Sequence, residues 1–62
     1  MKSDKYFYNN KDIQEILQVK ESKAYKVMQQ LNKELRNKGY LTKQGVVNAK
    51  YFNERYGLEE YE

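Results

Sequence analysis

Apolar residues recur at spacings of three and four in two stretches of this chain, as they do along helices that bury one face. The first stretch is short and holds Ile13, Ile16 and Leu17. Asn9, just before it, can act as an N-cap, and Asp12 suits the positive end of the helix dipole. The pattern therefore predicts a short amphipathic helix that begins after Asn9 and ends at a tight turn over residues 18–20.

The second stretch is longer and predicts a helix that begins at Glu21. Its apolar stripe consists of Ala24, Val27, Met28, Leu31 and Leu35. Gly39 stands just past the stripe, where a left-handed residue commonly ends a helix, and Lys38 suits the negative end of the dipole. If Gly39 is that C′ residue, Tyr40 and Leu35 occupy the two positions that touch in such a cap.

Segments prone to β structure flank the two helices. The aromatic stretch over residues 5–8 predicts a short edge strand. Residues 40–43 and 46–48 are also β-prone, and the short Gln44-Gly45 spacer between them predicts a β-hairpin.

The chain then predicts a last helix and an acidic tail. Asn48 can cap a helix from Ala49 to Tyr56, which Gly57 ends, and residues 58–62 form the tail. The side chains expected in the core are Phe7, Ile13, Ile16, Leu17, Val19, Ala24, Val27, Met28, Leu31, Leu35, Leu41, Val47, Phe52 and Tyr56.

A short helix joined to a longer one by a three-residue turn is the helix-turn-helix arrangement, and the predicted hairpin has the size of a wing. We therefore expect a mainly α fold with a small β-hairpin: a winged helix-turn-helix of three helices, a short N-terminal strand and a two-stranded wing. At 62 residues this is a single domain over residues 1–62, with an ordered core of about 5–57 and the acidic tail 58–62.

Composition excludes several kinds of function. The chain has no Cys and no His, so it offers no disulfide, no thiol nucleophile, no zinc finger and no His acid or base. It has no Gly-rich phosphate loop, and Asp12 and Glu15 suit a cap and a solvated surface rather than a catalytic pair. We expect no enzyme activity, no cofactor and no small-molecule ligand.

Two features missing from the sequence decide which compartment we expect. No apolar run approaches 18 residues, and Met1–Lys5 lacks the apolar segment of a signal peptide. A cytoplasmic protein without a membrane partner is the expectation.

Charge is distributed unevenly along the chain. The net charge is +3, yet residues 19–50 carry seven Lys and one Arg against Glu21 and Glu34, a local net charge of +6. Glu59, Glu60 and Glu62 in the tail contribute −3. The predicted long helix and wing are therefore basic, which favours an anionic partner such as DNA.

Three segments resemble a known family. Tyr8-Asn9-Asn10-Lys11-Asp12-Ile13-Gln14-Glu15-Ile16-Leu17-Gln18-Val19 resembles the opening of small excisionase-type domains, which are relatives of the DNA-binding half of MerR-type regulators. Residues 22–28 resemble the start of their recognition helix, and residues 38–47 with Tyr51-Phe52 resemble their wing and closing helix. The resemblance covers roughly residues 6–56.

This resemblance implies a winged helix-turn-helix that binds double-stranded DNA and is encoded by a bacterial phage, plasmid or conjugative element. It implies an excision factor that acts beside an integrase, or a transcription regulator. Two positions depart from the family pattern. Gln18 stands where many relatives have Gly, and Lys20 stands where many have a Ser or Thr cap. Since Lys cannot accept a bond from the free N–H groups, Glu21 is left to serve that helix end by its charge.

The outer stripe of the long helix supplies the candidate DNA contacts. Only the first turns of a recognition helix reach base edges, so Glu21, Ser22, Lys23 and Lys26 are the candidates for base readout. The whole set expected on this helix is Glu21, Ser22, Lys23, Tyr25, Lys26 and Gln30, and on the wing Lys43, Gln44 and Gly45. Candidate phosphate contacts are Asn10, Lys11, Lys20, Lys33 and Lys50.

Each of these readings has an alternative. The basic stripe is also typical of an ordinary solvated face, and Glu21 can complement the helix dipole without touching DNA. Tyr25 can serve packing alone, and Gln44-Gly45 can be a plain turn. The competing function is a protein-only adaptor that uses the same scaffold to dock a partner protein without reading DNA. The acidic tail suits contact with an integrase or with a second copy of the chain under either function.

Overall fold

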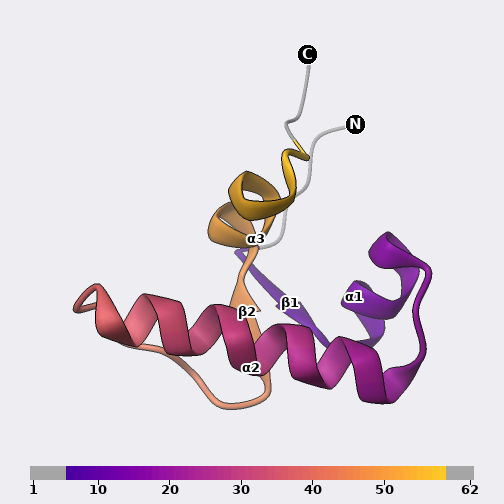
Figure 1. Ribbon diagram of the computed structural model, residues 1–62, viewed down its shortest axis with the longest axis horizontal. Coiled ribbons are helices and arrows are strands. Elements are labelled where there is room, and N and C mark those ends of the chain that lie inside the picture. The colour runs from indigo at the N-terminus through magenta and orange to yellow at the C-terminus, as the bar shows by residue number, and fades with distance from the viewer. Residues whose placement is uncertain (1–5, 59–62) are drawn as a thin grey trace.

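The computed structural model describes residues 6–58, so the expectations for Lys5, for the first residues and for tail residues 59–62 lie outside the described part. Its elements are β1 (Phe7–Asn9), α1 (Asn10–Leu17), α2 (Glu21–Asn37), β2 (Val46–Asn48) and α3 (Ala49–Tyr56). Figure 1 shows α1 beside the first half of α2, and the strand pair passing behind α2 toward α3. The expected mainly helical fold with three helices and a small antiparallel sheet is confirmed.

The partner of the second strand differs from the prediction. β2 pairs antiparallel with β1, with Tyr8 opposite Val47, and not with residues 40–43, which form no strand. A strand here must bury one face, and Tyr8 and Val47 turn into the core together at 7% and 1% exposure. Residues 40–43 have no such face, because the successive residues Tyr40 and Leu41 are 62% and 100% exposed. The wing is therefore a loop, residues 39–45, and not a two-stranded hairpin; we call it the wing loop.

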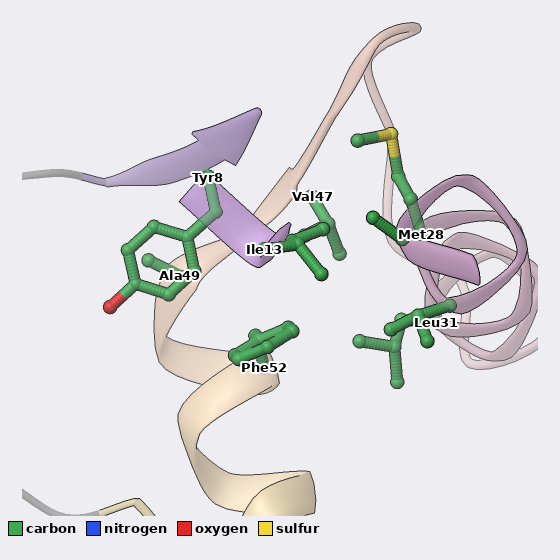
Figure 2. Close-up of a cluster of buried hydrophobic side chains, with 9 residues drawn as sticks. Tyr8, Ile13, Met28, Leu31, Val47, Ala49 and Phe52 are labelled. Atoms are coloured by element: carbon green, nitrogen blue, oxygen red, sulfur yellow. The ribbon is translucent and has the colours of Figure 1, made fainter. Parts of the chain in front are cut away.

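The core gathers side chains from every element of the described chain. Figure 2 shows Tyr8, Ile13, Val47 and Phe52 converging on Met28 and Leu31 of α2. The rings of Tyr8 and Phe52 meet edge to face with their centroids 5.3 Å apart, an arrangement that aromatic pairs favour. The buried apolar residues are Tyr8, Ile13, Ala24, Val27, Met28, Leu31, Leu35, Val47, Ala49 and Phe52.

Four expected core positions are exposed instead. Phe7 is 47% and Leu41 100% exposed, and Ile16 and Tyr56 also face solvent in part. Side chains alternate along a strand, so burying Tyr8 turns Phe7 outward. Tyr56 keeps one contact with the core, since its ring lies 4.9 Å from that of Phe52.

Local signals set the helix ends as predicted. Asn9 and Asp12 form a reciprocal capping box: the Asp12 N–H donates to Asn9 Oδ1 at 2.8 Å, and the Asn9 N–H donates to Asp12 Oδ2 at 3.0 Å. At the far end of α2, Gly39 has φ 94°. The Tyr40 N–H donates to the Leu35 carbonyl and the Gly39 N–H to the Arg36 carbonyl, both at 3.0 Å, which is the predicted glycine-terminated cap.

The wing loop is attached to α2 by side chains. Asn32 is buried in α2, and its Nδ2 donates to the Val46 carbonyl at 2.9 Å, where β2 begins. Arg36 Nη1 reaches Thr42 Oγ1 at 3.3 Å. Figure 1 shows the segment after α2 turning back and running beside the helix to β2. The loop therefore has a defined position against α2 although it contains no strand.

Candidate nucleic-acid interface

The two faces of α2 are separated as predicted. Its apolar stripe is buried, and the outward positions are exposed polar and basic side chains. The exposed set includes Ser22, Lys23, Lys26, Gln30 and Lys33. Because neighbouring residues on an α-helix are about 100° apart, these side chains spread over a broad outer face. Such a face can lie against an extended anionic surface.

The N-terminal end of α2 is held by α1. Asn10 Nδ2 donates to the Glu21 carbonyl at 3.2 Å, while Asn10 Oδ1 accepts from Gln14 Nε2 at 2.6 Å. The sequence predicted Asn10 as a phosphate contact, and the structure engages both ends of its amide inside the protein. This bridge fixes the first turn of α2 relative to α1, which is the end expected to read bases.

The turn between α1 and α2 bears both departures from the family pattern. Gln18 has φ 58° and ψ 48°, the left-handed conformation that Gly adopts more easily than a residue with a Cβ. Its side chain compensates in part, since Nε2 donates to the Glu15 carbonyl at 2.9 Å. Lys20 makes no side-chain cap bond, as expected, and the Ala24 N–H closes the first turn of α2 onto the Lys20 carbonyl.

The wing loop and one edge of α2 enclose a groove, which we call the wing groove. Tyr25, Gln29, Lys33 and Arg36 line it from α2. Lys43, Gln44 and Gly45 line it from the loop. The structure thus brings the predicted wing residues next to two predicted helix residues, Tyr25 and Lys33. It also adds Gln29 to the set, which the sequence reading missed because Gln29 lies outside the basic stripe.

The other predicted helix residues face a different hollow. Lys23, Lys26 and Gln30 lie on the side of α2 that faces α3, where they line a hollow together with Arg55 and Tyr56. The candidate residues of α2 are therefore divided between two flanks of one helix. Lys11 lies exposed in the first turn of α1, and Lys50 lies exposed in the first turn of α3, on a third groove described below.

A polar cluster that the sequence reading missed joins α2 to α3. Glu34 Oε1 accepts from Tyr51 Oη at 2.6 Å and from Arg55 Nε at 2.8 Å. Its Oε2 accepts from Arg55 Nη2 at 2.9 Å and from Gln30 Nε2 at 2.8 Å. We call these four residues the Glu34 cluster. The only sequence signal for it is the spacing of four between Tyr51 and Arg55 on α3 and between Gln30 and Glu34 on α2.

The cluster also changes the electrostatics of α2. The hydrogen bonds from Arg55, Tyr51 and Gln30 hold the pKa of the Glu34 carboxyl well below its usual range. The carboxylate in turn raises the pKa of the Arg55 guanidinium and of the Tyr51 phenol. Glu34 is one of only two acids in residues 19–50, and its charge is matched by Arg55. The lysines of the α2 outer face therefore meet little opposing charge from it.

Comparison with known proteins decides the family. No family model and no solved structure matches the chain. The ICEBs1 excisionase of Bacillus subtilis strain 168 is 40% identical over 50 residues, which cover 81% of this chain and 78% of that protein. This chain belongs to the excisionase family. The resemblance to small excisionase-type domains is thereby confirmed.

Two further observations concern the chemistry open to this member of the excisionase family. Within residues 6–58, no three His, Cys, Asp or Glu side chains come together as a group that could hold a metal ion. No helix in that same range is long and apolar enough to cross a membrane.

Proposed function

We propose that this protein is a DNA-binding recombination directionality factor of a bacterial mobile element. It binds double-stranded DNA through α2 and the wing loop and directs excision beside an integrase in the cytoplasm. The observation that carries the proposal is the exposed face of α2, basic and rich in amides, with the cationic tip of the wing loop beside it. Membership in the excisionase family supports the same role.

In this proposal α2 enters the major groove, which is about 12 Å wide and admits one helix. Its first turns present Glu21, Ser22, Lys23 and Lys26 to base edges, since the N-terminal residues of a recognition helix reach furthest. Lys suits guanine, and Glu can accept from the amino group of cytosine. Gln30, one turn further along, reaches the edge of the same site.

The wing loop contacts the backbone next to that site. Lys43 carries the charge, and Gln44 and Gly45 lie exposed beside it on the loop. Lys33 and Tyr25 line the wing groove, so a phosphate that lies there meets α2 and the loop together. Further phosphate contacts come from Lys11, Lys20 and Lys50, and Asn10 acts indirectly by holding α2.

A salt titration tests the DNA contact. If about 4–6 phosphates are neutralised, log K against log salt falls with a slope near −4 to −5 on B-form DNA. Lys33→Gln and Lys43→Gln should each reduce that slope by about 1 and weaken binding on every sequence alike. Lys26→Gln should weaken the cognate site more than a scrambled duplex, by about 1–3 kcal/mol.

Lys38→Gln is the matched control. It removes the same charge, but Lys38 lies at the end of α2 with its Nζ 5.3 Å from the Tyr51 ring centroid, away from the wing groove. Its slope on a duplex that carries a single site should equal that of the unaltered protein. Absence of binding to any duplex at about 50 mM salt, including DNA from the ends of the element, would reject the proposal and favour the protein-only adaptor.

Excision and transcription regulation use the same surface and need a separate assay. Purified integrase and a plasmid carrying both ends of the element should yield excised circles only when this protein is added. Lys43→Gln and Lys26→Gln should reduce that yield in proportion to their loss of binding. Normal binding without any effect on excision would instead assign the protein to transcription regulation.

A further inference from the structure

A third groove borders the wing groove and shares Asn32, Thr42 and Lys43 with it. Its exposed apolar lining has no role in the fold or in the proposed DNA contact. Three exposed apolar side chains line it: Phe7 at 47%, Tyr40 at 62% and Leu41 at 100% exposure. Single exposed apolar residues are common on protein surfaces, but three around one hollow mark a contact surface. Leu41 adds nothing to the core, so it is free to contact a partner.

The same groove is basic. Lys38, Lys43 and Lys50 line it, and Glu54 is the one acid among its described lining residues. Lys38 is held over the Tyr51 ring, with its Nζ 5.3 Å from the centroid. The chemistry therefore suits a segment that carries carboxylates next to apolar or aromatic side chains. We call this surface the basic groove.

The basic groove opens away from the outer face of α2. Its lining residues from the body of α2 are Asn32 and Leu35, both buried and both on the side of the helix that faces the core. The outer face of α2 lies on the opposite side of the same helix. The apolar part of the basic groove, around Phe7, Tyr40 and Leu41, therefore stays accessible when the outer face of α2 is covered. Lys43 and Lys50 at its rim are shared with the proposed phosphate contacts, whereas Lys38 is not.

We propose that the basic groove binds residues 58–62 of a second copy of this chain. That segment reads Leu58-Glu59-Glu60-Tyr61-Glu62 and carries three carboxylates beside one aliphatic and one aromatic side chain. The carboxylates complement the lysines at the rim, while Leu58 and Tyr61 cover Tyr40 and Leu41. The acidic segment and the basic groove belong to one sequence, and their opposite charges select a second copy as the occupant.

The contact links copies that bind neighbouring sites on DNA. A segment this short buries little surface, so the free protein associates weakly. On DNA with two adjacent sites the second copy is already held close, and a weak contact then acts at a high effective concentration. The consequence is cooperative filling of repeated sites, which supplies specificity that a single small module lacks.

Sedimentation equilibrium of the full chain, without DNA, tests the contact. Association should rise with protein concentration at about 50 mM salt and weaken at least tenfold at about 500 mM, since exposed charges are then screened. Leu41→Ser should weaken it at least tenfold and leave the unfolding midpoint unchanged. A chain that stays monomeric at millimolar concentration and low salt overturns the proposal.

A charge exchange tests which segments meet. The groove variant Lys38→Glu/Lys50→Glu and the tail variant Glu59→Lys/Glu60→Lys/Glu62→Lys should each fail to associate alone. An equimolar mixture of the two should associate, because each supplies the charge that the other has reversed. Association that persists in either variant alone, or a mixture that remains monomeric, contradicts the assignment.

Two other occupants of the basic groove give distinct results. If the segment folds onto its own chain, the Leu41 methyl resonances shift on tail reversal with no dependence on protein concentration. If an integrase is the true partner, those resonances are insensitive to the tail and shift only when integrase is added. Either result overturns the second-copy contact and leaves the salt-titration test of DNA binding unaffected.

Discussion

Leu31→Ala and Leu41→Ala make the same change at two sites that differ completely in burial. Leu31 is 2% exposed and packs among buried side chains from the other elements, whereas Leu41 is fully exposed. At Leu31 the substitution removes three buried carbons, or about 2.4 kcal/mol at about 0.8 kcal/mol each. The cavity that remains adds to this, within the range of about 2–5 kcal/mol found for such changes.

That loss is most of the stability of the domain. A core in a chain of this size rarely supplies more than about 3–5 kcal/mol, so Leu31→Ala should retain about 0–2 kcal/mol at 25 °C. Urea unfolding followed by circular dichroism measures this directly. A loss of about 2–3 kcal/mol corresponds to a fall of roughly 10–20 °C in the melting temperature.

Leu41→Ala is the control and should change stability by no more than about 0.5 kcal/mol. The reasoning fails if Leu31→Ala melts within a few degrees of the unaltered protein, since that would place Leu31 outside the core. It fails equally if Leu41→Ala is as damaging as Leu31→Ala. The second result would mean that the wing loop packs inward.

Three further predictions concern the turn, the Glu34 cluster and the start of α2. Gln18→Gly should raise the melting temperature by a few degrees, because the left-handed conformation at φ 58° costs a residue with a Cβ about 1–2 kcal/mol. A lower melting temperature would show that the lost bond from Gln18 Nε2 to the Glu15 carbonyl matters more. The lowered pKa of Glu34 means that its contribution to stability is present above the unfolded-state pKa of about 4.3 and is lost as pH falls through the folded-state value. The stability difference between the unaltered protein and Glu34→Gln, from urea unfolding, should therefore be larger at pH 7 than at pH 3, and an equal difference would contradict the cluster. Asn10→Ala removes the hydrogen bond to the Glu21 carbonyl, which is worth about 0.5–1.5 kcal/mol. Amide hydrogen exchange should become faster in the first turn of α2 but not around Phe52. Uniform acceleration would indicate general destabilisation.

The helices could be predicted because their signals are local. The capping box at Asn9 and Asp12 and the cap at Gly39 each involve residues within a few positions of one another, and the structure has both. The 3.6-residue period is sampled over 17 residues in α2, which is enough to fix which side is buried. The exposure of the candidate DNA contacts on α2 follows from the same period.

The groupings within the candidate site needed the three-dimensional arrangement. Sequence periodicity places Tyr25, Lys23 and Lys33 on one helix but says nothing about which flank meets the wing loop and which meets α3. The Glu34 cluster joins residues 17 and 21 positions apart, and no local rule connects them.

The sequence by itself thus determined the three helices, their caps and the two-faced character of α2. Only the tertiary structure decided that β2 pairs with β1, that Tyr8 is buried in place of Phe7, and that Leu41 lies in solvent. The physical reason is the length of the strands. A strand of three residues carries too few alternations to fix its register or its partner, so the choice is made by packing against residues about 40 positions away.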